Sequence, residues 1–287
     1  MLRKVFCFTV TSLLLVLMAA SQAKEEYLDA FIVKVKPDKR ADFDAAAKKA
    51  AEANRSNNGD RWIAMETIYG DGDTITFIST RQGYADIEKG TAAFGQSLNK
   101  ALGEAGAKKL FQDFGSSLVS SRGEIRRRRW DLSANAPGDA AGRAKIVGQA
   151  RFLRTTIVHV RPGHLLEYED VVKNVKAAAE KANPPQTIYV SQAVAGNQGL
   201  VFYITSLQKS LADFDNVQPV RQLLGEDGFR NLQKASAEHV LSSETVINRF
   251  LPELSNPPDE VASVAPDFWK PKATPAATRK PQTPKPQ

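Results

Sequence analysis

Alternating apolar and polar side chains predict that segments 27–36 and 152–161 are β-strands, because β-branched and aromatic residues recur there with a period of two. In each segment the more apolar set is expected to lie under helices, and the mixed set is expected to face the other way. The apolar sets are Phe31, Val33 and Val35 in the first segment, and Thr156, Val158 and Val160 in the second.

A proline and an amphipathic helical pattern follow each of these strands, and the later patterns occur in the same order twice. Each copy continues with a predicted hairpin, a long helical region and a last strand, which gives the order β-α-β-β-α-β. The hairpin strands are 61–69 with 74–80 and 186–194 with 200–206, the helical regions are 84–119 and 210–241, and the last strands are about 122–130 and 244–251.

The two copies also match residue by residue, which indicates a tandem duplication. Segment 32–37 (Ile-Val-Lys-Val-Lys-Pro) matches segment 157–162 (Ile-Val-His-Val-Arg-Pro), and the Leu-Gly-Glu-x-Gly element at 102–106 returns at 224–228. Further along, segment 77–80 (Phe-Ile-Ser-Thr) resembles segment 203–206 (Tyr-Ile-Thr-Ser).

The expected fold class is therefore α+β, with two tandem ferredoxin-like βαββαβ units packed sheet to sheet as an intramolecular pseudo-dimeric α/β barrel. A four-stranded sheet with both helices on one face leaves its other face in need of a partner, and the second copy supplies one. The expected segments are a signal peptide at 1–23, repeats at 24–133 and 151–256, a linker at 134–150, and a Pro-rich disordered tail at 257–287.

The first 23 residues resemble an export signal, with basic Arg3 and Lys4, an apolar run, and small residues before the expected cleavage point after Ala23. An uncleaved N-terminal anchor is the alternative. Cleavage would leave a periplasmic or secreted chain with no further transmembrane segment. It would also remove Cys7, the single cysteine, and would exclude disulfides and thiolate chemistry.

The charge balance argues against a nucleic-acid partner. The chain has 39 Lys and Arg residues against 32 Asp and Glu residues and a pI near 9.4, but much of the excess lies in the signal and the tail. The nearly balanced body lacks the basic surface of a phosphate binder. The basic tail allows a contact with the anionic cell envelope.

The duplicated strand–Pro–helix pattern resembles the dimeric α/β-barrel superfamily, which includes antibiotic-biosynthesis-type monooxygenases, stress-response barrel proteins and haem-handling members. This resemblance implies that the space between the two sheets holds a ligand. It identifies no specific member and assigns no catalytic residue.

Candidate binding residues follow from the faces of the predicted strands. Lys34 and His159 belong to the mixed sets and are expected to face the inter-sheet space. His159 is the best candidate for proton transfer or haem contact, because imidazole titrates near neutrality and binds metals. A locally satisfied strand histidine is the alternative. Trp62 and Tyr203 are candidate aromatic walls of the same space.

Four arginines, 126–129, precede Trp130 and have no counterpart run in the second copy. A buried strand here would carry arginines on both faces, so the run is predicted to leave the sheet. Arg127 and its counterpart Arg249 are candidate anion contacts, with a solvated edge as the alternative. No metal site is expected, because the three histidines are scattered.

No nucleophile elbow, phosphate loop or dinucleotide fingerprint occurs in the sequence, so catalysis and cofactor remain open. The leading hypothesis is a module that binds a small, partly apolar molecule between the sheets. The alternatives are a cofactor-free oxygenase or haem-linked oxidoreductase, and a cell-envelope interaction protein.

Overall fold

The computed structural model describes residues 25–182 and 186–270. The predicted signal peptide, 1–23, lies outside these ranges. Within them, no helix is long and apolar enough to cross a membrane.

The element order is β-α-β-β-α-β, a connecting helix, β-α-β-β-α-β again, and two short C-terminal helices. The strands are β1 (Tyr27–Val35), β2 (Ile63–Tyr69), β3 (Thr74–Arg81), β4 (Leu118–Arg128), β5 (Phe152–Val160), β6 (Tyr189–Ala195), β7 (Leu200–Gln208) and β8 (Val240–Phe250). The helices are α1 (Arg40–Ser56), α2 (Tyr84–Ser116), α3 (Ala140–Gln149), α4 (Leu165–Lys181), α5 (Val220–His239), α6 (Asp259–Ala262) and α7 (Pro266–Trp269).

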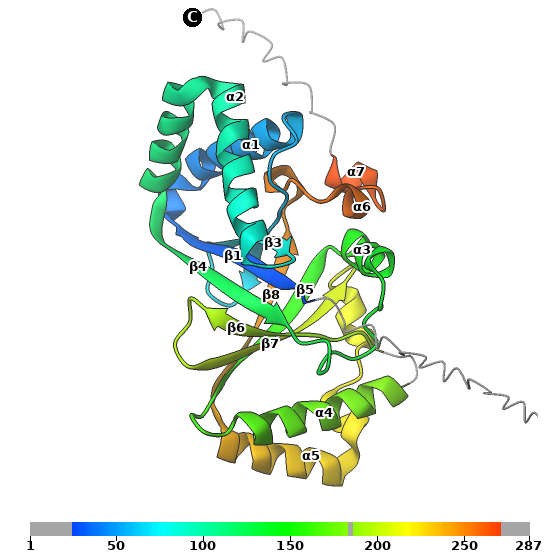
Figure 1. Cartoon of the computed structure of the whole chain (residues 1–287). Coiled ribbons are helices and arrows are strands. Elements are labelled where there is room, and N and C mark those ends of the chain that lie inside the picture. The colour runs from blue at the N-terminus through cyan, green and yellow to red at the C-terminus, as the bar shows by residue number, and fades with distance from the viewer. Residues whose placement is uncertain (1–24, 183–185, 271–287) are drawn as a thin grey trace, which may run out of the picture.

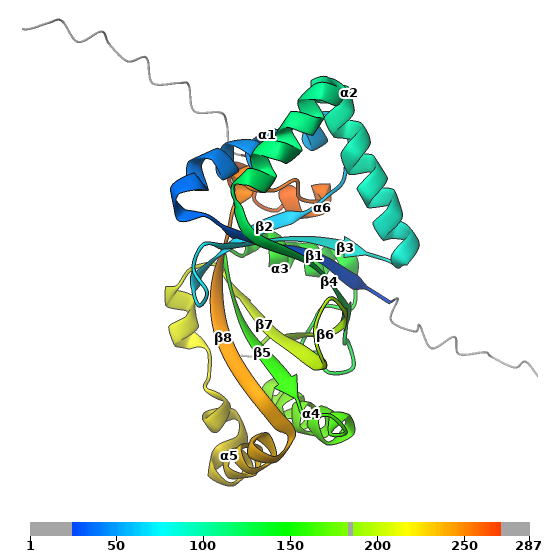
Figure 2. The ribbon, with the colours of Figure 1, turned by 90° about the vertical axis from the view of Figure 1, so that its left-hand side faces the viewer.

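The eight strands form one closed antiparallel barrel with the order β1-β3-β2-β8-β5-β7-β6-β4. Helices α1 and α2 lie on one side of the barrel, and α4 and α5 lie on the opposite side (Figures 1 and 2). The sheets of the two halves do not stack as separate layers. They join edge to edge through the β2–β8 and β4–β6 ladders, so that the inner faces of both sheets become the barrel interior.

The ladders of the two halves have corresponding registers. The β2–β8 junction corresponds to the β6–β4 junction. The isolated bridge beside the first junction corresponds in the same way to the bridge beside the second. The corresponding pairs are Met65–Phe250 with Ser191–Arg128, and Trp62–Asn256 with Ala134–Ile188. A position in one half therefore has a defined counterpart in the other.

This register corrects one of the sequence matches. Phe31 lies opposite Phe77, while its counterpart Thr156 lies opposite Ile204 rather than Tyr203. The match between segments 77–80 and 203–206 is thus displaced by one residue. Because side chains alternate between faces, the displacement matters: Phe77 packs under the helices, whereas Tyr203 lines the barrel interior.

The predicted apolar faces of the opening strands are confirmed. Val33 and Val35 are fully buried with Phe43 of α1 in the core beneath α1 and α2. Val158 and Val160 lie in the corresponding core of the second half. Both long helices are kinked at a glycine with positive φ, Gly103 (+71°) in α2 and Gly225 (+69°) in α5, a conformation that favours glycine.

The segment predicted as a linker, 134–150, is largely helical. It contains α3, which begins where the Asp139 carboxylate accepts a hydrogen bond of 2.7 Å from the Gly142 amide. Helix α3 packs on α6 beside the barrel, and Ala144 and Val147 contribute to a core that includes Met65 and Phe250 from the strands. The prediction of a simple tether is wrong.

The segment predicted as the start of a disordered tail is also folded as far as residue 270. Helices α6 and α7 occupy it, and the Trp269 side chain is fully buried. Its ring packs on Phe250 at a centroid distance of 5.5 Å, and its indole Nε1 donates to the Gly148 carbonyl over 2.9 Å. Residues 271–287 lie outside the described part of the chain.

We expect Trp269→Ala to lower the free energy of unfolding by about 3–5 kcal/mol, because it leaves a cavity and an unpaired carbonyl. Urea unfolding followed by circular dichroism measures this change. Lys270→Ala, a matched change at the next, exposed position, should have little effect. Equal stability of wild type and Trp269→Ala would show that residues 257–270 do not pack on the barrel.

Candidate functional site

A cavity of about 1290 Å³ lies in the second half, between the outer face of the sheet and helices α4 and α5. We call it the helix–sheet cleft. The sheet contributes Val158, Val190 and Ile204 to its wall, and the helices contribute Val172 and Leu223. The cleft is therefore a largely apolar space inside a layer that is normally solid core.

The corresponding layer of the first half is filled by aromatic rings. Phe43 of α1 packs against Phe114 of α2 with a centroid distance of 4.9 Å, and Phe31 and Phe77 from the sheet stack at 6.4 Å. Trp62 packs edge-on against a further phenylalanine of α2 at 5.6 Å. These rings occupy the space between the sheet and both helices.

In the second half, smaller side chains stand at most of these positions, and all of them line the cleft. Only the counterpart of Phe43 is still aromatic, namely Tyr168. The other replacements are Thr156 for Phe31, Ile188 for Trp62, Ile204 for Phe77 and Ser236 for Phe114. Ser236 follows the kink glycine of α5 at the same distance along the chain as Phe114 follows the kink glycine of α2.

Helix α5 reflects this loss of volume. Helix α2 buries Leu98 and Leu110 completely or nearly so, whereas every residue of α5 retains some exposure. Missing rings remove dispersion contacts on both walls of a cleft, and a ligand of matching shape would restore them. The cleft, at about 1290 Å³, is larger than the range of about 300–1,000 Å³ that is usual for small-molecule sites.

Among the described residues, Tyr168 is the one phenol on the cleft wall. It is buried, and burial raises the pKa of its hydroxyl well above the ordinary value, so the group is neutral at physiological pH. At the mouth, the Lys176 ammonium donates to the Asp131 carbonyl over 2.9 Å. The wall thus offers neutral polar atoms together with charged side chains, namely those of Arg154, Lys176, Lys209, Asp213 and Asp215.

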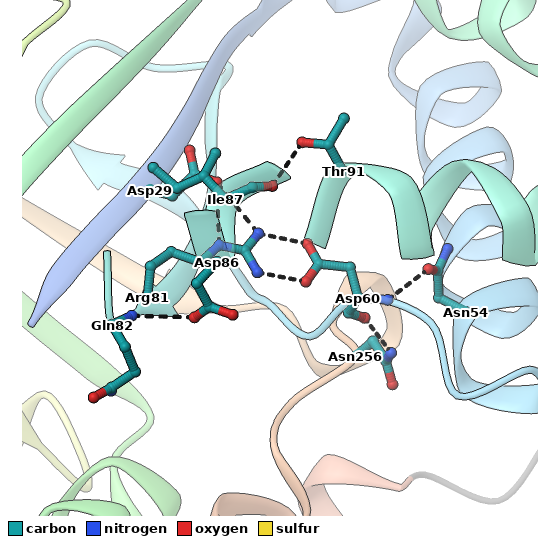
Figure 3. Close-up of polar contacts among 9 residues, drawn as sticks. All are labelled: Asp29, Asn54, Asp60, Arg81, Gln82, Asp86, Ile87, Thr91 and Asn256. Atoms are coloured by element: carbon teal, nitrogen blue, oxygen red, sulfur yellow. Dashed lines mark hydrogen bonds and ion pairs between the residues drawn. The ribbon is translucent and has the colours of Figure 1, made fainter. Parts of the chain in front are cut away.

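In the first half, the equivalent end of the layer is sealed by a buried ion network (Figure 3). Arg81 donates to both carboxylate oxygens of Asp60 at 2.6 and 2.7 Å, and it donates to Asp29 at 3.2 Å. Burial alone would lower the pKa of Arg81, but the two carboxylates outweigh it and raise the pKa. A Cβ at Gly90 would lie 2.3 Å from the Arg81 guanidinium, so a larger residue there would have to displace Arg81 from its present position.

The barrel interior contains a second, smaller cavity of about 680 Å³. Beside it, the Arg126 guanidinium lies 3.5 Å above the Tyr203 ring and donates from Nε to Glu124, whose side chain is fully buried. Asn197 donates to the Tyr203 hydroxyl over 2.9 Å, and burial raises the pKa of Tyr203 to about 12. Several polar groups on this wall therefore already have partners within the protein.

The arginine run does not leave the sheet, contrary to the prediction. Strand β4 continues through Arg128, so that Arg126 and Arg128 face the barrel interior while Arg127 and Arg129 face outward. The arginines on both faces are tolerated because three of them meet carboxylates. Arg129, for example, donates to Asp131 over 2.6 Å, and this bond outweighs burial and raises its pKa.

Three of the candidate binding residues, Lys34, Trp62 and Tyr203, border the barrel cavity. Lys34 is paired with Asp71 of the β2–β3 turn. The Trp62 indole donates to the Leu254 carbonyl over 2.7 Å, and its ring packs into the first helix layer. The structure thus brings these residues near one space, although the polar group of each already has a partner in the protein.

The other three candidates lie elsewhere. His159 sits near the end of β5, opposite Val201 and Ser242, and lines neither cavity. Arg249 donates from Nε to Glu66 over 3.0 Å on the outer face. Burial would raise the pKa of Glu66, but Arg40 and Arg249 outweigh it and lower the pKa. Arg127 also faces outward, away from the barrel cavity.

Sequence reasoning missed the helix–sheet cleft, although a signal for it was present. The aromatic positions of the first copy, such as Phe31 and Phe114, are Thr156 and Ser236 in the second. A comparison of side-chain volumes between the copies would have located the missing rings. The one-residue displacement in the third strand concealed the pair Phe77 and Ile204.

Comparisons with known proteins give similarity of structure only. No family model matches the chain, and no curated protein matches it. Similar solved structures include an anthrone oxidase-like protein, with 12% identity, a TM-score of 0.49, and coverage of 80% of this chain and 93% of that chain. A heme-binding protein from Thermus thermophilus has 11% identity, a TM-score of 0.44, and coverage of 81% and 93%.

A mutant chlorite dismutase from Candidatus Nitrospira defluvii has 12% identity, a TM-score of 0.44, and coverage of 83% and 95%. This chain's own strand order and closed ladder give it the architecture of a dimeric α/β barrel.

The difference between the two helix layers predicts that exchanging the residues at one pair of corresponding positions, Phe114 and Ser236, has unequal effects on stability. Phe114→Ser should lower the free energy of unfolding by about 3–5 kcal/mol, because it opens a cavity in a filled layer. Ser236→Phe should cost less than about 1 kcal/mol, because the added ring enters empty space. Urea unfolding of both variants tests this. A large loss for Ser236→Phe would indicate that α5 packs closely on the sheet.

The raised pKa of Tyr203 predicts a specific alkaline sensitivity. In the unfolded chain a tyrosine ionises near pH 10, whereas the folded protein keeps Tyr203 protonated to about pH 12. Its contribution to stability is therefore complete below pH 10 and is lost as the pH rises toward 12. Urea unfolding at a series of pH values from 9 to 11.5 measures this. The free energy of unfolding should fall less steeply with pH for Tyr203→Phe than for the wild type. Identical slopes would contradict the burial of this phenol.

Proposed function

We propose that this protein binds a small, predominantly apolar molecule, and that the ligand occupies the helix–sheet cleft of the second half rather than the space between the two sheets. The main support is the replacement of the aromatic rings that fill the first helix layer by smaller side chains at the corresponding positions of the second. A space between sheet and helices that is apolar, large and bounded by regular elements has the usual properties of a ligand site.

We further infer that the two halves descend from a tandem duplication of one ferredoxin-like unit. The matching ladder registers and the kink glycines Gly103 and Gly225 support this inference. Duplication would allow one copy to keep a solid core and so preserve stability, while the other copy exchanged core volume for a binding site.

The barrel cavity is the weaker candidate for the same ligand. Its wall contains the Arg126–Glu124 pair and the Lys34–Asp71 pair, and a ligand there would have to compete with these internal contacts. It is also about half the volume of the cleft. The walls of the two cavities are similarly apolar, so the preference for the cleft rests on its larger volume and on the internal contacts of the barrel wall.

The described residues do not favour a haem-linked function. Neither cavity is lined by a histidine in the described part of the chain. His164 and His239 instead contact each other, with their Nδ1 atoms 2.9 Å apart. We therefore propose binding without assigning a reaction, and the oxygenase alternative stays a prediction from the sequence.

We also propose export, on the sequence of residues 1–23 alone. Binding would then take place in the periplasm or outside the cell, where a carrier can hold an apolar molecule that water dissolves poorly. Contact of the basic end of the chain with the envelope stays a prediction, because residues 271–287 lie outside the described ranges.

Fluorescence of N-phenyl-1-naphthylamine, a neutral apolar probe, tests the proposed site. We expect the wild type to bind it with enhanced emission and Ser236→Phe to weaken binding at least about tenfold, because the new ring takes the space of the probe. Gln233→Phe places the same ring on an exposed position of α5 outside the cleft wall, and it should bind as the wild type does.

The proposed site would be wrong if Ser236→Phe and Gln233→Phe bound the probe equally well. In that case, weaker binding by variants of the barrel wall, such as Tyr203→Ala, would place the ligand between the sheets instead.

A further inference from the structure

The end of the cleft at Arg154 has different charged residues from the corresponding end of the first helix layer, and this difference indicates the chemistry of the ligand. There, Asp29 and Asp60 hold Arg81 in the sealed network of Figure 3. The ladder registers place three residues of the second half at the corresponding positions, and all three line the cleft. They are Arg154 for Asp29, Gln208 for Arg81 and Gln186 for Asp60.

Local contacts support this correspondence. Asp29 lies opposite a serine of β3, and Arg154 lies opposite a serine of β7. The carbonyl of Asp60 accepts a hydrogen bond of 2.6 Å from an asparagine Nδ2 in the segment after β8. The carbonyl of Gln186 accepts one of 2.8 Å from an asparagine Nδ2 in the segment after β4. The two donors are not counterparts, because Asn256 corresponds to Ala134 whereas the second donor is Asn135, but each donates to the carbonyl at the compared position.

The exchange removes both carboxylates and introduces a cation. In the first half one arginine faces two acids, whereas the second half has one arginine and two neutral amides at these places. The formal charge of the three residues therefore changes from −1 to +1, and the carboxylate acceptors are replaced by amides, which also donate hydrogen bonds.

These donors lack protein acceptors within the described ranges. Arg154 forms no ion pair there, and its guanidinium lies 5.4 Å from the centre of the Phe214 ring. Asp213 also lines the cleft, but its carboxylate accepts from the Ser210 amide over 3.0 Å. The Gln186 Nε2 atom is buried and has no hydrogen-bond partner. A buried donor without an acceptor costs free energy that a ligand oxygen can recover.

We infer that the ligand is an amphipathic anion of the long-chain carboxylic acid class. Its carboxylate would take the place that Asp29 and Asp60 hold in the first half, facing Arg154 and Gln186, and its hydrocarbon chain would lie along the apolar wall toward Ser236. A carboxylate suits this end because guanidinium and amide N–H groups bind its two oxygens directionally. The inference rests on the proposed function, since it specifies the chemistry of the molecule in the same cleft.

A competition assay with two matched chains tests the inference. Oleate and oleyl alcohol share the same hydrocarbon tail and differ in the head group. Each is added, below its micellar concentration, to wild-type protein loaded with N-phenyl-1-naphthylamine. We expect oleate to displace the probe at a concentration at least about tenfold lower than oleyl alcohol does, because only the anion pairs with Arg154.

Two variants separate the head-group contact from the apolar site. Arg154→Gln should weaken the binding of oleate about tenfold. The affinities for oleyl alcohol and for the probe should stay nearly unchanged. Gln186→Leu should weaken oleate to a smaller extent, because it removes the second donor. Arg161→Gln removes a charge from an exposed position just beyond β5, outside the cleft wall, and should bind oleate as the wild type does.

The outcomes distinguish the two proposals. Absence of probe binding to the wild type would overturn the proposed function itself. The anionic head group would be overturned, and an apolar site would remain, if the wild type bound the probe but oleate and oleyl alcohol displaced it at equal concentrations. The same conclusion would follow if Arg154→Gln and Arg161→Gln lost equal amounts of affinity for oleate.

Discussion

Closure of the antiparallel ladder is the constraint on which the rest of this structure depends. Because β2 bonds to β8 and β4 bonds to β6, neither sheet can slip by a residue without breaking both junctions. Each strand position is therefore committed either to the barrel interior or to a helix layer. The barrel also fixes two outer faces, each of which needs a cover of helices, so differences between the halves must appear in those layers.

The two layers meet this need differently. Aromatic rings of the strands and helices pack against one another in the first layer, with Arg81 and its carboxylates at one end. The second layer keeps the same backbone elements but has smaller side chains and an arginine without its acids. The proposed function divides stability and binding between the halves: the barrel and the first layer hold the fold, and the second layer has room for another molecule.

The sequence predicted the element order, the strand faces and the two-part architecture, because period-two alternation and helical stripes are local signals. It failed where long-range contacts decide the outcome. Arg126–Arg129 suggested a strand leaving the sheet, but Arg128 pairs with Glu26 and Arg129 pairs with Glu169, which are both distant in the sequence. Residues 257–270 are rich in proline, yet Trp269 is buried against a core built from other segments. Among the candidate site residues, the barrel-facing Lys34 followed from alternation, whereas Tyr203 was predicted only as an aromatic residue of a central hairpin. The cleft did not follow from alternation, because its signal lies in the loss of side-chain volume between the two copies, at positions such as Thr156 and Ser236, rather than in a local pattern.

Xenon binding in crystals tests the central claim most directly, because xenon enters apolar cavities regardless of the natural ligand. The account predicts xenon density between the β5–β7 sheet and helices α4 and α5, and none in the corresponding layer beneath α1 and α2. A crystal structure in which α5 lies closely packed on the sheet, with no xenon in the second layer, would contradict it.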